Sequence, residues 1–481
     1  MTAGGIDVAD VVVVGAGPTG LLVAGDLAEA GVRVTVLERR LHESNLTRAF
    51  VVHARTLEQL DARGVADGLL ARGTKVDHFR LFGSVSVDLT PLPSRYPFML
   101  ITPQYEVEQA LTERLLAAGA TVVRGAEVGD VRQTADHVEV AYRDADGADR
   151  TLRAAYLVGA DGHHSVVRER LGLAFPGESV ARSLVLADVR MSEPPAEQLT
   201  VDGNAAGFCF VVPFGDGWYR IIVRDRRREL PDDAPADLEE IRWVARQVFG
   251  TDFGVHDPRW ISRFHSDERQ VERYRVGRVF LAGDAAHVHS PAGGMGMNTG
   301  LQDAANLGWK LAAAVRGRGG EQLLDSYHDE RHPVGEMVLK MSGGLLRAAL
   351  LTSPLARKLR NLAFPAAFAV PPIGAFVRLR QSGIGIGYGR PRGADRRVGT
   401  RAADVTATDG TRLYEALRGG RFVLVAPEGF AVPEGVTAHV VAGAQTALLV
   451  RPDGYVAWAG RSADGLVPAL RRWGVTPAVA A

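Results

Sequence analysis

Three glycine-containing segments place carboxylates or backbone amides at turns where a ligand could bind. In the first, a β-branched run at 11–14 leads into Gly15-x-Gly17-x-x-Gly20 and a helical pattern, and the following strand ends in Glu38. Such glycines allow a tight turn, close approach of a pyrophosphate to a helix N-terminus, and close helix–strand packing. The acid can accept a ribose hydroxyl and argues against a 2′-phosphate. This segment predicts a dinucleotide site, and at this point FAD and NAD both remain open.

The second segment, Val158-Gly-Ala-Asp161-Gly-His-His-Ser165, joins a predicted strand to a helix. Asp161 and Ser165 are residue types that cap helices. A ligand-binding turn and a plain capped turn are equally compatible with this segment alone.

The third segment begins with a strand that ends at Asp284, where a carboxylate can hold the hydroxyls of a polyol. The run Pro291-Ala-Gly-Gly-Met-Gly-Met-Asn298 then exposes backbone amides at the start of a predicted helix over 299–315. A helix N-terminus stabilises negative charge, such as the charge that a reduced flavin carries.

Two kinds of element must position these turns. Buried runs at 10–14, 32–37 and 278–282 predict parallel strands, whereas 176–275 alternates in short runs that predict an antiparallel sheet. One helix is expected over 56–70, with Leu57, Leu60 and Val65 on one face. Four strands are expected after residue 420, over 421–425, 438–441, 447–450 and 455–459.

Composition excludes several classes of protein. The 481 residues carry 56 Lys+Arg and 56 Asp+Glu, so no net charge favours nucleic acid or an anionic membrane. A single cysteine, Cys209, excludes an intrachain disulfide and a Cys-based zinc site, and it suits the cytoplasm. His287 and His289 lack a third ligand in their segment, so we expect structural roles and no metal. The apolar stretch 362–376, with three prolines, predicts a packed helix–turn–helix and no membrane contact.

Together, the three segments resemble those of the single-component FAD-dependent aromatic hydroxylases, the para-hydroxybenzoate and phenol hydroxylase group. The resemblance is closest to the branch that hydroxylates polycyclic aromatic polyketides, and it extends to Arg451-Pro-Asp-Gly454 near the C-terminus. It implies an α/β fold in which a GxGxxG Rossmann-like FAD-binding domain is interleaved with an antiparallel-sheet substrate domain, followed by a small thioredoxin-like domain. The implied division is an FAD-binding domain over 1–77, 101–175 and 276–345, a substrate-binding domain over 78–100 and 176–275, a helical connector over 346–385 and a C-terminal domain over 386–481.

The resemblance also implies which residues hold FAD. Arg48 and Gln104 would lie along the phosphates and ribityl chain, Asp161 would serve both FAD and transient NADPH, and Asp284 would bind the ribityl hydroxyls. Met295 stands where the family often has Gln, which removes a polar contact but keeps the backbone role. The full implied set is Gly15, Gly17, Gly20, Glu38, Arg39, Arg48, Gln104, Asp161, Asp284, Pro291, Gly294, Gly296, Met297 and Asn298.

The implied reaction is NADPH- and O2-dependent hydroxylation of a phenolic polyketide through a flavin C4a-hydroperoxide, in antibiotic or other secondary metabolism. A homodimer is compatible with the sequence. Four alternatives remain: Baeyer–Villiger or ring-opening oxygenation, a small-phenol hydroxylase, a flavin-dependent halogenase and a redox-silent FAD-binding module. The halogenase is disfavoured because halogenases usually carry a Trp-x-Trp-x-Ile-Pro stretch, which this sequence does not contain.

The substrate is expected between the flavin and the 176–275 sheet, because aromatic side chains suit a flat polycycle. The candidate lining residues are Tyr96, Phe98, Phe208, Phe210 and Trp218. No catalytic base is assigned, and the candidates are His78, Arg80, Tyr96, Arg220 and Arg224.

Overall fold

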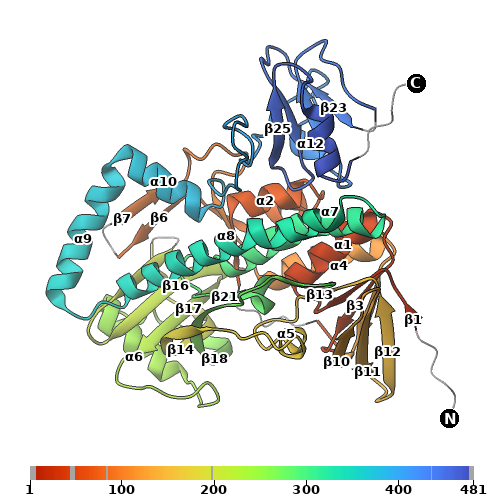
Figure 1. Cartoon of the computed structure of the whole chain (residues 1–481). Coiled ribbons are helices and arrows are strands. Elements are labelled where there is room, and N and C mark those ends of the chain that lie inside the picture. The colour runs from red at the N-terminus through yellow and green to blue at the C-terminus, as the bar shows by residue number, and fades with distance from the viewer. Residues whose placement is uncertain (1–6, 44–48, 83–84, 197–198, 435, 476–481) are drawn as a thin grey trace.

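A six-stranded, mostly parallel sheet forms the centre of the first layer (Figure 1). The computed structural model describes residues 7–43, 49–82, 85–196, 199–434 and 436–475. The strand order is β19 (Arg275–Val276), β20 (Val279–Leu281), β13 (Tyr156–Gly159), β2 (Val11–Val14), β3 (Val34–Glu38) and β9 (Thr121–Arg124). Only β19 runs antiparallel to its neighbour. All of β2 is buried, as expected for an apolar run that is covered on both faces.

Helices and a second sheet cover the two faces of this sheet. The helices are α1 (Pro18–Glu29), α4 (Gln104–Ala117) and α7 (Gly296–Val315), and α1 packs against both of the others. The covering sheet has the order β1 (Asp7–Val8), β12 (Asp149–Ala154), β11 (Val138–Arg143) and β10 (Glu127–Gln133), and α5 (Val166–Arg170) contacts β10. This is a mixed α/β fold built on a mostly parallel sheet, as the sequence predicted.

The expected single helix over 56–70 is wrong. The chain forms α2 (Ala54–Asp61) and then α3 (Ala66–Leu70), with Gly64 between them in the left-handed region at φ 73°. A glycine in this conformation ends the first helix. The apolar spacing nevertheless continues across the break, which is why the sequence resembles that of one helix.

The antiparallel layer is a six-stranded sheet, and each of its two faces packs into a different hydrophobic cluster. Its order is β15 (Thr200–Gly203), β16 (Gly207–Gly215), β17 (Trp218–Asp225), β14 (Gly177–Met191), β18 (Val255–Gln270) and β21 (His287–Val288). One face, with Cys209, Val211 and Ile221, is covered by α6 (Leu238–Phe249). The opposite face points toward the parallel sheet. Smaller antiparallel pieces lie beside it: β4 (Val51–Val52), β8 (Met99–Ile101) and β5 (Thr74–Val76), and the hairpin of β6 (His78–Leu81) and β7 (Val85–Asp88).

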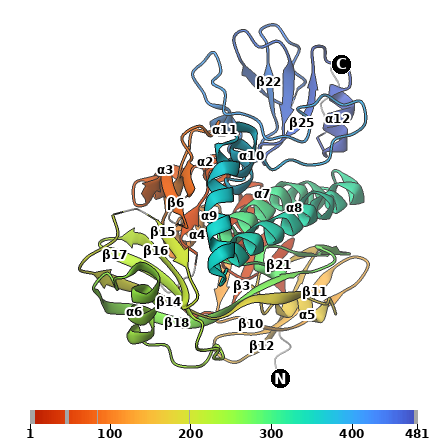
Figure 2. The same cartoon turned by 90° about the vertical axis from the view of Figure 1, so that its left-hand side faces the viewer.

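Long helices lead to a small C-terminal unit. They are α8 (Gly320–Ala349), α9 (Pro354–Ala369) and α10 (Pro371–Gln381). The unit contains α11 (Leu413–Ala416), α12 (Leu466–Arg472) and a mixed sheet of β23 (Thr437–Val440), β22 (Val423–Ala426), β24 (Ala447–Val450) and β25 (Val456–Gly460). In Figures 1 and 2 this unit stands above the two larger layers. Its four strands lie where the sequence placed them, to within two residues.

In the described part of the chain, no helix by itself has the length and apolar character needed to cross a bilayer. Only α9 and α10 together reach that length and composition, and they are bent by 96° at their junction.

Candidate cofactor and substrate site

The three glycine-containing segments meet at one edge of the parallel sheet. In the strand order β3, β2, β13 and β20, the carboxyl ends carry Glu38, Gly15, Asp161 and Asp284 side by side. Ligands of open α/β sheets bind outside the carboxyl ends of the strands. The topology therefore brings to one edge residues that the sequence spreads over 270 positions.

The first turn has the form of a pyrophosphate cradle. Gly15 has φ 104°, and a Cβ there would lie 2.3 Å from the carbonyl oxygen of Ala160. A Cβ at Gly20 would lie 2.0 Å from the carbonyl oxygen of Gly15, whereas one at Gly17 would meet nothing within 4 Å. No side chain caps α1, and its first turn holds no acid. The free amides and the open space over Gly17 therefore fit a bound diphosphate.

Glu38 is held as an ionised acceptor at the next strand end. Its Oε2 accepts from the amide of Ala16 at 2.7 Å, and its Oε1 accepts from the amide and Nε of Arg40, each at 2.9 Å. Burial opposes ionisation, but the hydrogen bonds from Arg40 and Ala16 outweigh it and lower the pKa of Glu38. Oε1 accepts two bonds and Oε2 only one, so Oε2 keeps a lone pair for a ribose hydroxyl. Arg40, which orients this carboxylate, was not among the predicted residues, and a contact of its exposed neighbour Arg39 with FAD stays a prediction.

Asp161 forms the capped turn that its segment suggested. It accepts from the Ser165 hydroxyl at 2.5 Å and from the Val167 amide at 3.1 Å, while burial raises its pKa. Arg168 in the same turn donates to the carbonyl oxygen of Ala285 at 3.1 Å, which ties the second segment to the third. Asp284 is exposed in the short 3-10 helix Gly283–Ala285 (η1). Contacts of Asp161 and Asp284 with FAD or NADPH stay predictions.

The remaining predicted cofactor contacts differ in their surroundings. Arg48 lies outside the described residues. Gln104 is the first residue of α4, and its Nε2 donates to Glu108 at 2.7 Å. Met295 is buried in a cluster with Val334 and Val338, so its side chain packs inward. This packing explains how Met stands where the resembled family often has Gln.

The loop 291–298 is fastened to β4 by Asn298 and His53. The Asn298 Nδ2 donates to the carbonyl oxygens of Val51 at 2.8 Å and Gly294 at 2.7 Å, and its Oδ1 accepts from the His53 amide at 2.8 Å. The His53 Nε2 donates to the carbonyl oxygen of Gly293 at 2.8 Å. These bonds hold the amides of this loop, predicted to face the isoalloxazine, in one conformation. His53 was missed, because nothing in the sequence links it to a loop 240 residues away.

Burial lowers the pKa of His53 to about 4, so the folded protein keeps it neutral while the unfolded chain protonates near pH 6.5. The contribution of neutral His53 to the free energy of unfolding is therefore complete above pH 6.5. This free energy falls by about 3 kcal/mol as the pH decreases from 6.5 to 4. His53→Gln, which keeps a neutral donor, is expected to flatten the fall in unfolding free energy between pH 7 and 4.5, measured by urea denaturation. The same flattening in the exposed-site control His78→Gln would contradict the assignment.

His287 and His289 lie behind this loop. The His287 Nε2 is 2.6 Å from Asp303, which also accepts from Arg331 at 2.7 Å and from the Gly283 amide at 3.2 Å. These contacts brace the turn that carries Asp284. Among the described residues, no group of three or more His, Cys, Asp or Glu side chains could hold a metal ion.

A cavity lies between the 291–294 loop and the antiparallel sheet. About 810 Å3 of space there is not filled by protein atoms, and part of it is continuous with solvent. Its described lining residues carry no ionisable side chain, and Gln381 is the only polar one. They are Phe50, Val51, Phe79, Leu81, Phe82, Met99, Leu184, Leu199, Val201, Phe208, Phe210, Ile222, Pro291, Ala292, Gly293, Gly294, Leu345, Leu346, Ala349 and Gln381.

Two of the five predicted substrate residues line this cavity. Phe208 and Phe210 alternate onto the inner face of β16, and Phe210 packs against Phe50 with ring centroids 5.9 Å apart. Trp218 is not in the lining and instead packs under the guanidinium groups of Arg190 and Arg259, at 4.6 and 5.8 Å.

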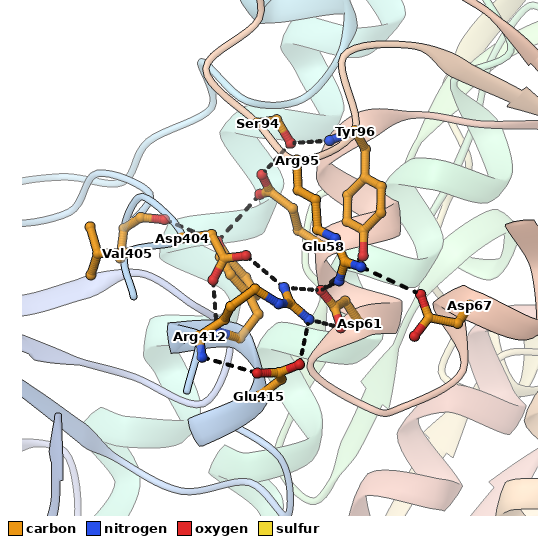
Figure 3. A network of polar contacts seen from close by, with 12 residues as sticks. Glu58, Asp61, Asp67, Ser94, Arg95, Tyr96, Asp404, Val405, Arg412 and Glu415 are labelled. Carbon is orange, nitrogen blue, oxygen red and sulfur yellow. Dashed lines mark hydrogen bonds and ion pairs between the residues drawn. The ribbon is translucent and has the colours of Figure 1, made fainter. Parts of the chain in front are cut away.

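Tyr96 and Phe98 also lie outside the cavity lining. The Tyr96 hydroxyl donates to Asp61 at 2.8 Å, and Asp61 accepts from Arg412 of the C-terminal unit at 2.7 Å (Figure 3). Phe98 packs edge-on against Tyr96, with centroids 6.2 Å apart. The excursion at 78–100 therefore places Tyr96 at the junction with the C-terminal unit rather than at the cavity.

None of the five candidate bases lines the cavity. Arg220 is fully buried in a bidentate pair with Asp188, at 2.7 and 2.8 Å. Burial, together with Asp61, raises the pKa of Tyr96 far above its usual value. His78 is exposed between Asp77 and Asp88, and Arg224 donates to the carbonyl oxygen of Arg182. Arg80, on β6, is likewise absent from the lining.

Comparisons with known proteins agree with this geometry. A family described as "FAD binding domain" matches residues 8–342, and one described as "Aromatic-ring hydroxylase, C-terminal" matches residues 395–477. The chain is 38% identical over 511 residues to the 12-dehydrotetracycline 5-monooxygenase/anhydrotetracycline 6-monooxygenase of Streptomyces rimosus, covering 98% of this chain and 99% of that protein. It is 38% identical over 475 residues to a rifampicin monooxygenase of Streptomyces venezuelae, covering 96% and 98%. The solved structure of CabE, an aromatic hydroxylase from angucycline biosynthesis, superposes with a TM-score of 0.86 at 35% identity, covering 98% and 99%.

Proposed function

Because the chain belongs to the FAD-dependent aromatic-ring hydroxylases and is an FAD-dependent aromatic monooxygenase, we propose that it hydroxylates a flat, polycyclic, polyketide-type phenol. NADPH and O2 are the proposed co-substrates. The observation that carries this proposal is the apolar cavity between the predicted flavin loop and the Phe208–Phe210 face. The relatives named for tetracycline and rifampicin oxygenation support a large substrate over a small phenol.

The chain itself binds the cofactor, orients the substrate and keeps water from the reaction. The Gly15–Gly20 turn and Glu38 would hold the diphosphate and ribose, and the 291–298 amides would face the flavin ring. When bound, FAD supplies the electron transfer from NADPH and the activation of O2. Water must be kept from the reacting oxygen, and apart from Gln381 the described lining offers water no polar side chain to bind.

The lining also selects the charge of the substrate. An ionised substrate group placed against the described lining residues would lose its hydration without gaining a partner, which is costly. Aromatic side chains such as Phe208, Phe210 and Phe50 suit stacked or edge-on contact with fused rings. We therefore propose that the substrate enters as a neutral, mostly apolar polycycle.

Gln381 is proposed to orient the substrate. It is the last residue of α10, and among the described residues its side-chain amide has no hydrogen-bond partner in the protein. Gln381→Leu keeps the volume but removes the polar contact, so we expect about a tenfold rise in KM, or a change in the hydroxylated position. Steady-state kinetics with product analysis measure both. Unchanged KM and unchanged position would show that Gln381 does not contact the substrate.

The proposal is tested by NADPH oxidation with and without polycyclic phenols. Strong stimulation by a polycycle, with hydroxylated product, supports it; fast oxidation that ignores substrate and yields only peroxide opposes it. An NMR spectrum of the product separates ring hydroxylation from insertion of an ester oxygen. A cytoplasmic location and a homodimer stay predictions from the sequence.

A further inference from the structure

The helices α9 and α10 carry an apolar surface that faces outward. Six of the ten exposed large hydrophobic side chains among the described residues belong to it, and we call these six the α9–α10 surface: Leu355, Leu359, Leu362, Val370, Ile373 and Phe376. The three leucines are 58–71% exposed and follow the spacing i, i+4, i+7, so they form one stripe along α9. Contiguous exposed apolar residues of this kind mark interaction sites.

The opposite side of α9 packs against the rest of the protein, so the leucine stripe faces outward. Arg360 is 4% exposed, stacks at 4.0 Å on the Phe82 ring, and pairs with Asp202 at 3.2 Å. Phe364 meets Phe82 edge-on at 6.1 Å. The sequence predicted a packed helix–turn–helix over 362–376; the helices and the turn are present, but the packing is one-sided. In Figure 1, α9 and α10 form an outer corner of the molecule, and in Figure 2 they face the viewer.

The same segment has a strongly one-sided charge. Residues 337–394 contain no Asp or Glu, although the whole chain has zero net charge. They contain nine cations: Lys340, Arg347, Arg357, Lys358, Arg360, Arg378, Arg380, Arg390 and Arg392. Six of these make no ion pair with a carboxylate of the described residues: Arg357, Lys358, Arg378, Arg380, Arg390 and Arg392.

We propose that the α9–α10 surface docks onto an anionic lipid bilayer, with both helices lying in the interface. Exposed leucines and a phenylalanine beside unpaired cations are the combination that interfacial helices use. The 96° bend between the helices suits lying on a bilayer rather than crossing it. A second copy of the chain would bring like charges together, so the charge pattern favours lipid over self-association.

Docking would hold the cavity close to the bilayer. Leu345, Leu346 and Ala349, at the end of α8, directly precede this surface and line the cavity, and Gln381 directly follows it and lines the cavity. The six residues of the α9–α10 surface therefore lie in the segment of chain that connects two parts of the cavity wall.

Vesicle flotation of the full-length, FAD-loaded protein tests the proposal. Vesicles of phosphatidylcholine alone are compared with vesicles containing about 30% phosphatidylglycerol, at low and high salt. We expect at least about tenfold tighter binding to the anionic vesicles, weakened by salt. Leu359→Glu/Leu362→Glu is expected to lower this binding at least about tenfold. The matched control is Leu116→Glu, at a leucine that is 54% exposed on α4, and it is expected to bind like the unmodified chain.

Flavin content and thermal unfolding show that each variant is folded, so loss of binding is not loss of structure. The proposal is overturned if the anionic vesicles do not bind the protein, or if Leu116→Glu loses binding equally. It is also overturned if sedimentation velocity shows a dimer that Leu359→Glu/Leu362→Glu dissociates, because a second copy would then cover this surface.

Discussion

Gly17→Ala is expected to cost the protein its FAD while leaving its fold in place. A methyl group at Gly17 meets no protein atom within 4 Å, and the residue has φ −78°, so the apoprotein accommodates alanine without strain. The same methyl would occupy the space that a bound diphosphate needs. Overpacking of this kind costs about 1–3 kcal/mol, which corresponds to roughly 5- to 150-fold weaker FAD binding.

The measurement is a titration of apoprotein with FAD, followed by flavin fluorescence. Gly68→Ala is the matched control, because that glycine also has open space around its Cβ position but lies in α3, away from the sheet edge. The control is expected to bind FAD normally. FAD binding by Gly17→Ala that equals the control would show that the diphosphate does not approach this turn.

Phe210→Glu is expected to abolish hydroxylation while FAD stays bound. Phe210 lines the apolar cavity, so a carboxylate there would be buried without a partner or would draw water in. We expect kcat/KM to fall on the order of 100-fold or more, and NADPH oxidation to yield peroxide instead of product.

Trp218→Glu is the control on the same sheet. That side chain lies outside the cavity lining beside Arg190 and Arg259, which would receive the new carboxylate. It is expected to keep most of the activity, as is Phe210→Leu, which preserves an apolar wall. Equal losses in Phe210→Glu and Trp218→Glu would remove the basis for placing the substrate in this cavity.

The sequence predicted the strands and turns at the carboxyl edge of the parallel sheet because each of them is local, whereas their contacts with FAD stay predictions. Gly15, Glu38 and Asp284 each follow a strand of their own, and parallel strands bring their ends to one edge whatever the length of chain between them. Alternation also predicted that Phe208 and Phe210 share a face. These inferences needed only periodicity and the position of strand ends.

Contacts between distant segments could not be predicted in the same way. Alternation places Trp218 on a strand but does not say what covers it, and nothing local reveals that Tyr96 meets Asp61 and the C-terminal unit. His53 and Gln381 reach the site from segments that carry no motif. The outward face of α9 was missed because an apolar stripe in a sequence predicts a buried helix face. Only the structure shows that this stripe is exposed.

Incubation with NADPH, 18O2 and a panel of polycyclic phenols tests whether the protein transfers oxygen from O2 to an aromatic ring. We expect at least one polycycle both to stimulate NADPH oxidation and to gain a single 18O-labelled oxygen atom on an aromatic ring, as read by mass spectrometry and NMR. Flavin reduction by NADPH with no oxygen transfer to any polycycle, or product oxygen that derives from water, would contradict this expectation.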